Sequence, residues 1–190
     1  MAKGMYHYIG RAWRGLERKE MQPRYIEWRA SDAIVEVEKP LRLDRARALG
    51  YKAKKGFFVV RVRLNRGGRK RSRHTHGRKS RKQHVRKILK MSYQWVAEQR
   101  AEKRYPNLEV LNSYYLGKDG QHYFFEVILV DPFRNEIKND RTINWICNIE
   151  NKNRAQRGLT TAGKKSRGLG TKSRNMKTRP SGRAWGRIGK

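Results

Sequence analysis

Gly158-Leu-Thr-Thr-Ala-Gly163-Lys164 approaches the spacing of the phosphate-binding loop of nucleoside triphosphatases. That loop needs a buried strand before its first glycine, and a Ser or Thr after its lysine to hold magnesium. Here Lys165 takes the Ser/Thr position, and the preceding residues 151–157 are polar and basic rather than strand-like. Nucleotide hydrolysis is therefore not favoured, and the segment is better explained as part of a basic surface.

Histidine, cysteine and acidic residues provide no stronger site. His74 and His76 could share a metal only with His84 or Cys147, the ligand spacing is incomplete, and the surrounding positive charge opposes a cation. Cys147 is the single cysteine, so it cannot form an internal disulfide, and its apolar neighbours predict a buried thiol. The nine acids of residues 98–150 form no evident catalytic pair and are expected to balance nearby bases. We expect no metal, no cofactor and no enzymatic activity.

The positive charge of the chain is localised. The 190 residues include 48 Lys and Arg against 16 Asp and Glu, a formal net charge of +32. Residues 1–44 hold nine bases and seven acids, and residues 98–150 hold seven bases and nine acids, so these two blocks are neutral together. Residues 45–97 and 151–190 hold 19 and 13 bases and no acid. The whole excess lies in two acid-free blocks, which indicates a polyanionic partner.

Structured RNA is the partner that this pattern favours. Arg binds phosphate oxygens with two parallel hydrogen bonds, Lys supplies point charges, and glycines let the backbone approach phosphates. Aromatic and imidazole rings in basic surroundings can stack on unpaired bases. The candidate RNA-binding residues are Lys52, Lys54, Arg61, Arg63, Arg66, Gly67, Gly68, Arg69, Lys70, Arg71, Arg73, His74, His76, Arg78, Lys79, Arg81, Lys82, Arg154, Arg157, Gly158, Gly163, Lys164, Lys165, Arg167, Gly168, Gly170, Lys172, Arg174, Arg183 and Trp185.

The elements that must position these residues form an α+β domain with a mainly antiparallel sheet. Alternation in residues 57–64 places Phe58, Val60, Val62 and Leu64 on a core face and makes the opposite face partly basic. A turn-rich Gly117-Lys-Asp-Gly joins the last two strands as a hairpin. The expected order is strand 33–38, helix 41–49, strand 57–64, helix 84–104, strand 110–116 and strand 123–130, after a helical segment at 5–19 with a further turn near 25–29.

Two segments are expected to lie outside this core. Residues 65–83 contain nine Lys or Arg and no apolar side chain, so they predict a basic arm between a strand and a helix. Residues 151–190 carry only five sizeable apolar side chains, too few to order forty residues by burial. We therefore divide the chain into an RNA-binding core, 1–150, which contains the arm, and an extended basic tail, 151–190.

Several strings resemble the archaeal and eukaryotic (e-type) family of large-subunit ribosomal protein fifteen. They are Leu41–Lys54, Gly67–Arg71, Pro106–Tyr114, Phe125–Pro132 and Arg157–Gly170, and together they span nearly the whole chain. The family has a three-layer α/β/α fold around an antiparallel sheet, in the order β-α-β-α-β-β. The resemblance implies this fold and a structural role in the large ribosomal subunit, in contact with large-subunit ribosomal RNA and neighbouring ribosomal proteins, in one copy per ribosome.

The departures from the family pattern are few. Lys55, Glu109, Tyr115 and Thr161 stand where many members have Gln, Arg, Trp and Ser. Of these, Glu109 alone weakens a possible phosphate contact. We expect a cytoplasmic protein with no membrane segment and no small-molecule substrate, since no stretch approaches the roughly 20 apolar residues of a membrane helix.

Two other functions deserve comparison. A chromatin or nucleoid protein that compacts DNA would fit the charge, but such proteins usually dimerise or repeat, and the chain has neither an internal repeat nor a zipper. An RNA-modifying enzyme would need a pocket with perturbed acids beside the basic surface. The sequence has no signature of such a pocket.

Overall fold

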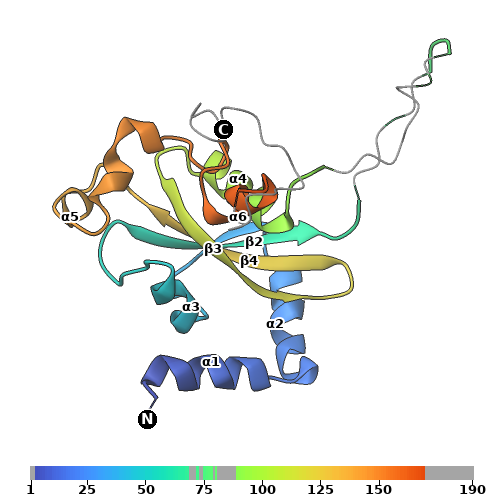
Figure 1. Ribbon diagram of the computed structural model, residues 1–190. Coiled ribbons are helices and arrows are strands. Elements are labelled where there is room, and N and C mark those ends of the chain that lie inside the picture. Colours follow the sequence, from blue (N-terminus) through green and yellow to red (C-terminus); the bar gives the residue numbers. More distant parts are fainter. Residues whose placement is uncertain (1–2, 69–71, 73–74, 79, 81–88, 170–190) are drawn as a thin grey trace.

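A four-stranded antiparallel sheet lies at the centre of the computed structural model, which describes residues 3–68, 72, 75–78, 80 and 89–169. The strands are β1 (Ile34–Val37), β2 (Phe57–Asn65), β3 (Glu109–Lys118) and β4 (His122–Val130), in the spatial order β1-β2-β4-β3. Helices pack on both sides of this sheet (Figure 1). The α+β class expected from the sequence is confirmed.

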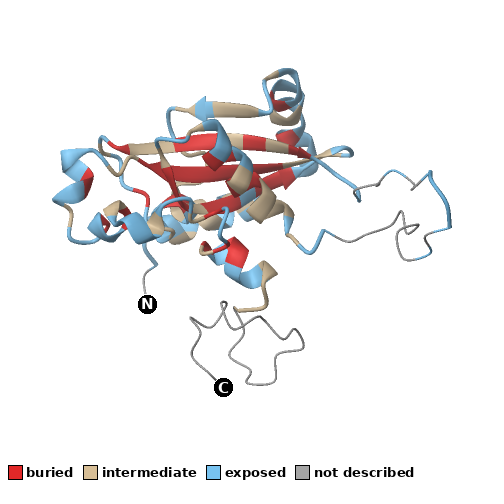
Figure 2. Cartoon of the chain, turned by 90° about the horizontal axis from the view of Figure 1, so that it is seen from above, coloured by how far each residue is buried: buried red, intermediate tan, exposed pale blue. Residues whose placement is uncertain are grey.

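Both faces of the sheet are core. One face buries Val60, Val62 and Leu64 of β2, and the other buries Val59 of β2 with Phe124 and Ile128 of β4 among its neighbours. The second face of β2 carries Arg61 and Arg63, as expected, but helices cover this face, so the two arginines are half-buried and Val59 is buried. Figure 2 shows that burial is concentrated along the central strands.

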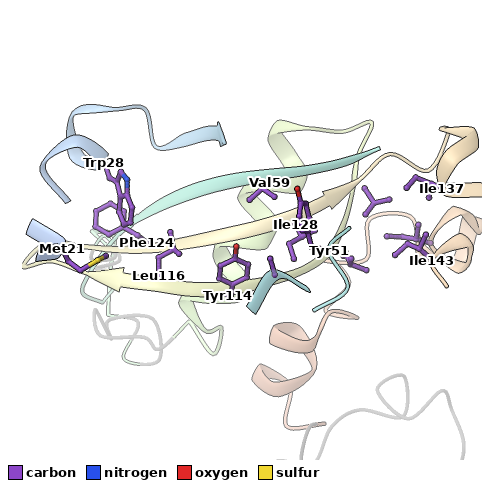
Figure 3. Close-up of a cluster of buried hydrophobic side chains, with 14 residues drawn as sticks. Met21, Trp28, Tyr51, Val59, Tyr114, Leu116, Phe124, Ile128, Ile137 and Ile143 are labelled. Carbon is purple, nitrogen blue, oxygen red and sulfur yellow. The ribbon is translucent and has the colours of Figure 1, made fainter. Parts of the chain in front are cut away.

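The amino-terminal helices cover the Val59 face. They are α1 (Met5–Gly15), α2 (Arg18–Ala30) and the short α3 (Leu43–Ala48). A reciprocal capping box between Glu17 and Glu20 begins α2. Trp28 of α2 meets Phe124 with ring centroids 5.1 Å apart (Figure 3). Tyr25 stacks on the same Phe124 ring at 5.5 Å. Aromatic packing therefore holds the end of α2 on the sheet.

Helix α4 (Tyr93–Arg104) covers the opposite face of the sheet. It begins later than the helix expected from residue 84, because Lys90 has a positive φ of 56° and the Ser92 hydroxyl caps the backbone N–H of Trp95. Residues 84–88 lie outside the described residues. The chain continues from β4 through α5 (Asn135–Lys138) and two single-turn 3-10 helices, Asn144–Cys147 and Ile149–Asn151.

Residues 151–169 fold back over α4 and end in α6 (Thr161–Ser166). This differs from the extended tail expected from residue 151. Ala155, Thr160 and Ala162 are buried, and the Trp95 indole N–H donates to the Ala155 carbonyl at 2.6 Å. The segment has few large apolar side chains, which is why the sequence predicted an extended tail. Buried small side chains and hydrogen bonds hold it in place instead. Residues 170–190 lie outside the described residues.

The aromatic cluster under α2 gives a test of the fold. Phe124 is fully buried between Tyr25 and Trp28. Phe124→Ala should lower the free energy of unfolding by about 3–5 kcal/mol in urea titrations, because it removes a buried ring and leaves a cavity. Phe133→Ala is the matched control, since that ring is 74% exposed. Equal effects of the two substitutions would contradict this packing.

Candidate nucleic-acid interface

Seventeen of the candidate RNA-binding residues lie within the described part of the chain. The others lie outside it: Arg69, Lys70, Arg71, Arg73, His74, Lys79, Arg81, Lys82, Gly170, Lys172, Arg174, Arg183 and Trp185. The described candidates do not form one cluster. They divide into side chains that are exposed and side chains that the fold uses for its own contacts.

The first part of the basic arm is attached at the β3–β4 hairpin. The Arg66 guanidinium donates to the Asp119 carbonyl at 2.6 Å and lies over the Tyr123 ring. The Tyr93 hydroxyl on α4 bonds both the N–H and the carbonyl of Gly67, at 2.9 and 2.7 Å. The β3–β4 hairpin and helix α4 therefore fix the point at which the arm leaves the sheet.

Beyond this attachment, the described arm residues are open to solvent. Gly67, Gly68, His76 and Arg78 are all exposed. Tyr93 was not among the candidates, and its position as the first residue of a helix after a basic stretch gave no signal of this role.

Lys52 and Lys54 bind the loop that follows α5. Their amines lie 2.7 and 2.6 Å from the same Asp140 carboxylate oxygen. Hydrogen bonds from both lysines hold the pKa of Asp140 well below its usual range. These lysines therefore neutralise an acid of the protein itself, and they fix the loop against the segment that leads into β2.

Arg61 and Arg63 extend from β2 toward the end of α2. The Arg61 guanidinium lies 5.1 Å from the Trp28 ring and donates to the Ser31 hydroxyl at 3.2 Å. Burial lowers the pKa of Arg61. Arg63 donates to the carbonyl of Arg29. In this structure both arginines fix α2 on the sheet.

Arg154 is a structural residue of the α4 side. Its guanidinium donates to the carbonyls of Val110 and Leu111, both at 2.7 Å, where a β-bulge interrupts the pairing of edge strand β3. Its other side faces the Trp145 ring at 4.9 Å. Burial lowers the pKa of Arg154, against the opposing charges of nearby glutamates. The arginine thus satisfies two backbone acceptors that the bulge leaves open.

Three buried glutamates hold residues 153–160, two through backbone N–H groups and the third through the Thr160 hydroxyl. Glu102 of α4 accepts hydrogen bonds from the backbone N–H groups of Ala155 and Gln156, at 3.0 and 2.9 Å. Glu109 of β3 accepts one from Asn153 at 3.0 Å. These acids balance Arg154, as expected for the acids of residues 98–150.

The third glutamate, Glu98, lies deepest. It is fully buried and accepts hydrogen bonds from the Ser113 and Thr160 hydroxyls. Burial raises the pKa of Glu98 to about 7, although these hydrogen bonds act in the opposite direction. The sequence argument missed this role. The available signal was the pair Glu98 and Glu102, one helical turn apart, beside the buried Ala97 and Ala101.

The segment that these glutamates hold exposes three cations. Arg157, Lys164 and Lys165 are exposed. Lys164 and Lys165 have no ion-pair partner within residues 3–68 and 89–169. They project from α6, which Thr160 caps by accepting a hydrogen bond from the Gly163 N–H at 3.2 Å. This is the part of the described surface where candidate cations gather without an acid.

The glycines of this segment have an internal role. A Cβ at Gly163 would lie 2.6 Å from the Cα of Gly158, and Gly158 has a φ of 68° and abuts Trp95. Arg167 donates to the Gly158 carbonyl at 3.0 Å, and Gly168 follows at a φ of 76°. Residues 152–158 form turns, so no strand leads directly into Gly158. The segment therefore lacks the geometry of a nucleotide-hydrolysing loop.

Within residues 3–68 and 89–169, no cluster of three or more His, Cys, Asp or Glu side chains could hold a metal ion. None of the helices described here is both long enough and apolar enough to cross a membrane.

Comparison with known families identifies the family of the chain. The family model described as Ribosomal L15, of the e-type, matches residues 4–185. The match covers the sheet, both helical layers, the basic arm and most of the segment after residue 150.

The buried Glu98 predicts a specific pH dependence of stability. Its folded-state pKa of about 7 lies above the ordinary value of 4.5. The folded protein therefore keeps this proton at pH values where the unfolded chain has lost it. The resulting stabilisation is complete below pH 4.5 and is lost as the pH rises through 7, by about 3 kcal/mol in total.

Glu98→Gln keeps a neutral hydrogen-bonding group and should remove this dependence. Urea unfolding at several pH values should show the wild type losing about 3 kcal/mol relative to the variant between pH 4.5 and 8. A difference between the two proteins that does not change with pH would contradict the buried, protonated state of Glu98.

Proposed function

Because the chain belongs to the Ribosomal L15 family, a structural and non-enzymatic component of the large ribosomal subunit, we propose that it binds and stabilises folded large-subunit ribosomal RNA through its phosphates. The contacts come from the two acid-free segments, the arm at 65–83 and the residues after 151. Its other partners are neighbouring ribosomal proteins, and it acts in the cytoplasm as one copy per ribosome.

The observation that carries this proposal is the internal use of the acids. Glu98, Glu102, Glu109 and Glu126 are buried, although Lys and Arg outnumber acids by 32 in the whole chain. Asp119 and Asp140 bind cations of the fold itself. Eight of the 16 acids are exposed, but none of them lies in the two acid-free segments, so the exposed cations of those segments are available to phosphates.

The candidate side chains differ in whether the fold already uses them for its own contacts. Arg157, Lys164, Lys165 and Arg78 are exposed and offer their charges directly. Arg61, Arg63, Arg154 and the lysines beside Asp140 position the interface instead. The thirteen candidates that lie outside the described residues are proposed as phosphate contacts on their sequence alone.

The division of the chain is revised in this proposal. Residues 153–169 act with the core, since Glu98, Glu102 and Glu109 bind them. The independent basic segment begins at residue 170.

Two truncations separate RNA binding from folding. A chain ending at Leu169 lacks seven positive charges but keeps every contact described above. Its free energy of unfolding should match the full chain, while the salt dependence of its affinity for transcribed large-subunit RNA should become shallower. The slope of log affinity against log salt should fall by up to about 5–6, at roughly 0.7–0.9 per lost phosphate contact.

A chain ending at Glu150 should lose stability as well, because three buried glutamates lose their partners. Duplex DNA of equal length is the control ligand for both chains, and it should bind more weakly than the folded RNA. Unchanged RNA affinity and salt slope after truncation at residue 169 would contradict the proposed role of that segment. Equal affinity for RNA and DNA would favour the nucleoid function instead.

A further inference from the structure

The face formed by α1 and α3 contains a cavity that the charge pattern did not predict. The cavity has a volume of about 410 Å³, which lies in the range of ligand pockets. Arg14 of α1, Arg45 of α3 and Arg42 line it, with Asp44 as its single acid and Tyr6 and Tyr115 at its walls. The helices α1 and α3 lie on the opposite side of the sheet from α4 and α6 (Figure 1).

Close packing of α1 against α3 brings these residues together. A Cβ at Gly10 would stand 3.0 Å from an Asp44 carboxylate oxygen, so glycine allows this approach of the two helices. The same carboxylate oxygen binds Arg42 at 3.0 Å, and the Arg42 guanidinium lies 5.3 Å from the Trp13 ring. Asp44 and Arg42 thus form an ion pair, and this pair fixes the part of the cavity wall that the two residues line.

Arg14 and Arg45 remain uncommitted. Both side chains are exposed. Neither side chain makes a hydrogen bond, ion pair or ring contact with any residue the structure describes. With Arg42 they place three guanidinium groups against one carboxylate in the cavity wall. Residues 1–44 are near neutral in sequence, yet six of their seven acids lie outside this lining. The local charge is therefore clearly positive, and it suits an anion with several acceptor oxygens.

The aromatic walls add a second preference. Tyr6 is 37% exposed and Tyr115 is 41% exposed, so each is partly open to a ligand, although one edge of the Tyr115 ring packs on Phe125 with centroids 5.7 Å apart. Arg47 donates to the Tyr6 hydroxyl and lies over its ring, which fixes that side chain on α1. A planar base can stack on such a ring while its phosphate meets the arginines.

We infer that this cavity binds one nucleotide of an unpaired RNA segment, with its phosphate between Arg14 and Arg45 and its base against Tyr6 or Tyr115. The inference rests on the proposed function and adds a second contact to it. This contact lies on the sheet face opposite the segment that carries Lys164 and Lys165, so the RNA meets the protein on two sides.

The test compares pairs of arginines in the full chain, with transcribed large-subunit RNA as the ligand. Arg14→Gln with Arg45→Gln should lower the slope of log affinity against log salt by about 1.4–1.8, the value for two phosphate contacts. Arg14→Lys with Arg45→Lys should keep most of the slope and lose part of the affinity, because lysine lacks the bidentate fork. The matched control is Arg100→Gln with Arg104→Gln, two exposed arginines on α4, and it should change the slope less.

Tyr6 tests the base contact. Tyr6→Leu should weaken RNA binding by roughly 5- to 100-fold if its ring carries the stacked base, and Tyr6→Phe should not. If Tyr6→Leu has no effect, the same pair of substitutions at Tyr115 must show it. Unchanged binding in both leucine variants overturns the base contact.

The outcomes distinguish this inference from the proposed function. If truncation at residue 169 weakens binding while the Arg14 and Arg45 pair behaves as the α4 control does, the cavity binds no RNA and the proposed function stands. If neither change affects binding, both fail. If the glutamine pair abolishes binding of inorganic phosphate in calorimetry but leaves RNA affinity unchanged, the cavity is a free-anion site and the RNA assignment is overturned.

Discussion

Buried carboxylates that bind backbone N–H groups are the interaction on which the rest of this structure depends. On the α4 side, Glu98, Glu102 and Glu109 hold the backbone and hydroxyls of residues 153–160. On the opposite side, Glu126 accepts hydrogen bonds from the Leu41 N–H and the Tyr114 hydroxyl. Each face of the sheet thus uses acids to attach a segment distant in sequence. A buried carboxylate is costly without such partners, so these attachments are specific.

This use of acids links the fold to its function. Carboxylates placed inside the protein neutralise Arg154 and satisfy backbone donors, and therefore do not offset the cations on the surface. Polar groups of the edge strand β3 are likewise satisfied within the protein, because Arg154 binds the two carbonyls that the bulge of β3 leaves unpaired. The basic segments then begin at fixed points, one held by Arg66 and Tyr93 and the other by the three glutamates. A large RNA would meet cations whose positions are set before binding, which lowers the entropy cost of association.

Local pattern was enough to predict the strands, the hairpin and α3, which ends before Gly50 with its φ of 99°. It was not enough wherever a distant partner decides the outcome. Arg61 resembles a surface residue in its strand, but Trp28 covers its guanidinium. Thr160 and Ala155 belong to a segment with few large apolar residues, and their partners Glu98 and Glu102 lie 62 and 53 residues earlier. Counting charge along the chain also missed the arginines that α1 and α3 bring together.

The most direct test of this account measures the reactivity of individual lysines toward an amine-acylating reagent, read by mass spectrometry in the free and RNA-bound protein. Lys164 and Lys165 are exposed without an acid partner, whereas the Lys54 amine is bound to Asp140 at 2.6 Å. The account predicts that large-subunit RNA protects Lys164 and Lys165 strongly and changes the reactivity of Lys54 little. Equal reactivity of Lys164 and Lys165 in both states would contradict the claim that the fold reserves these cations for phosphates.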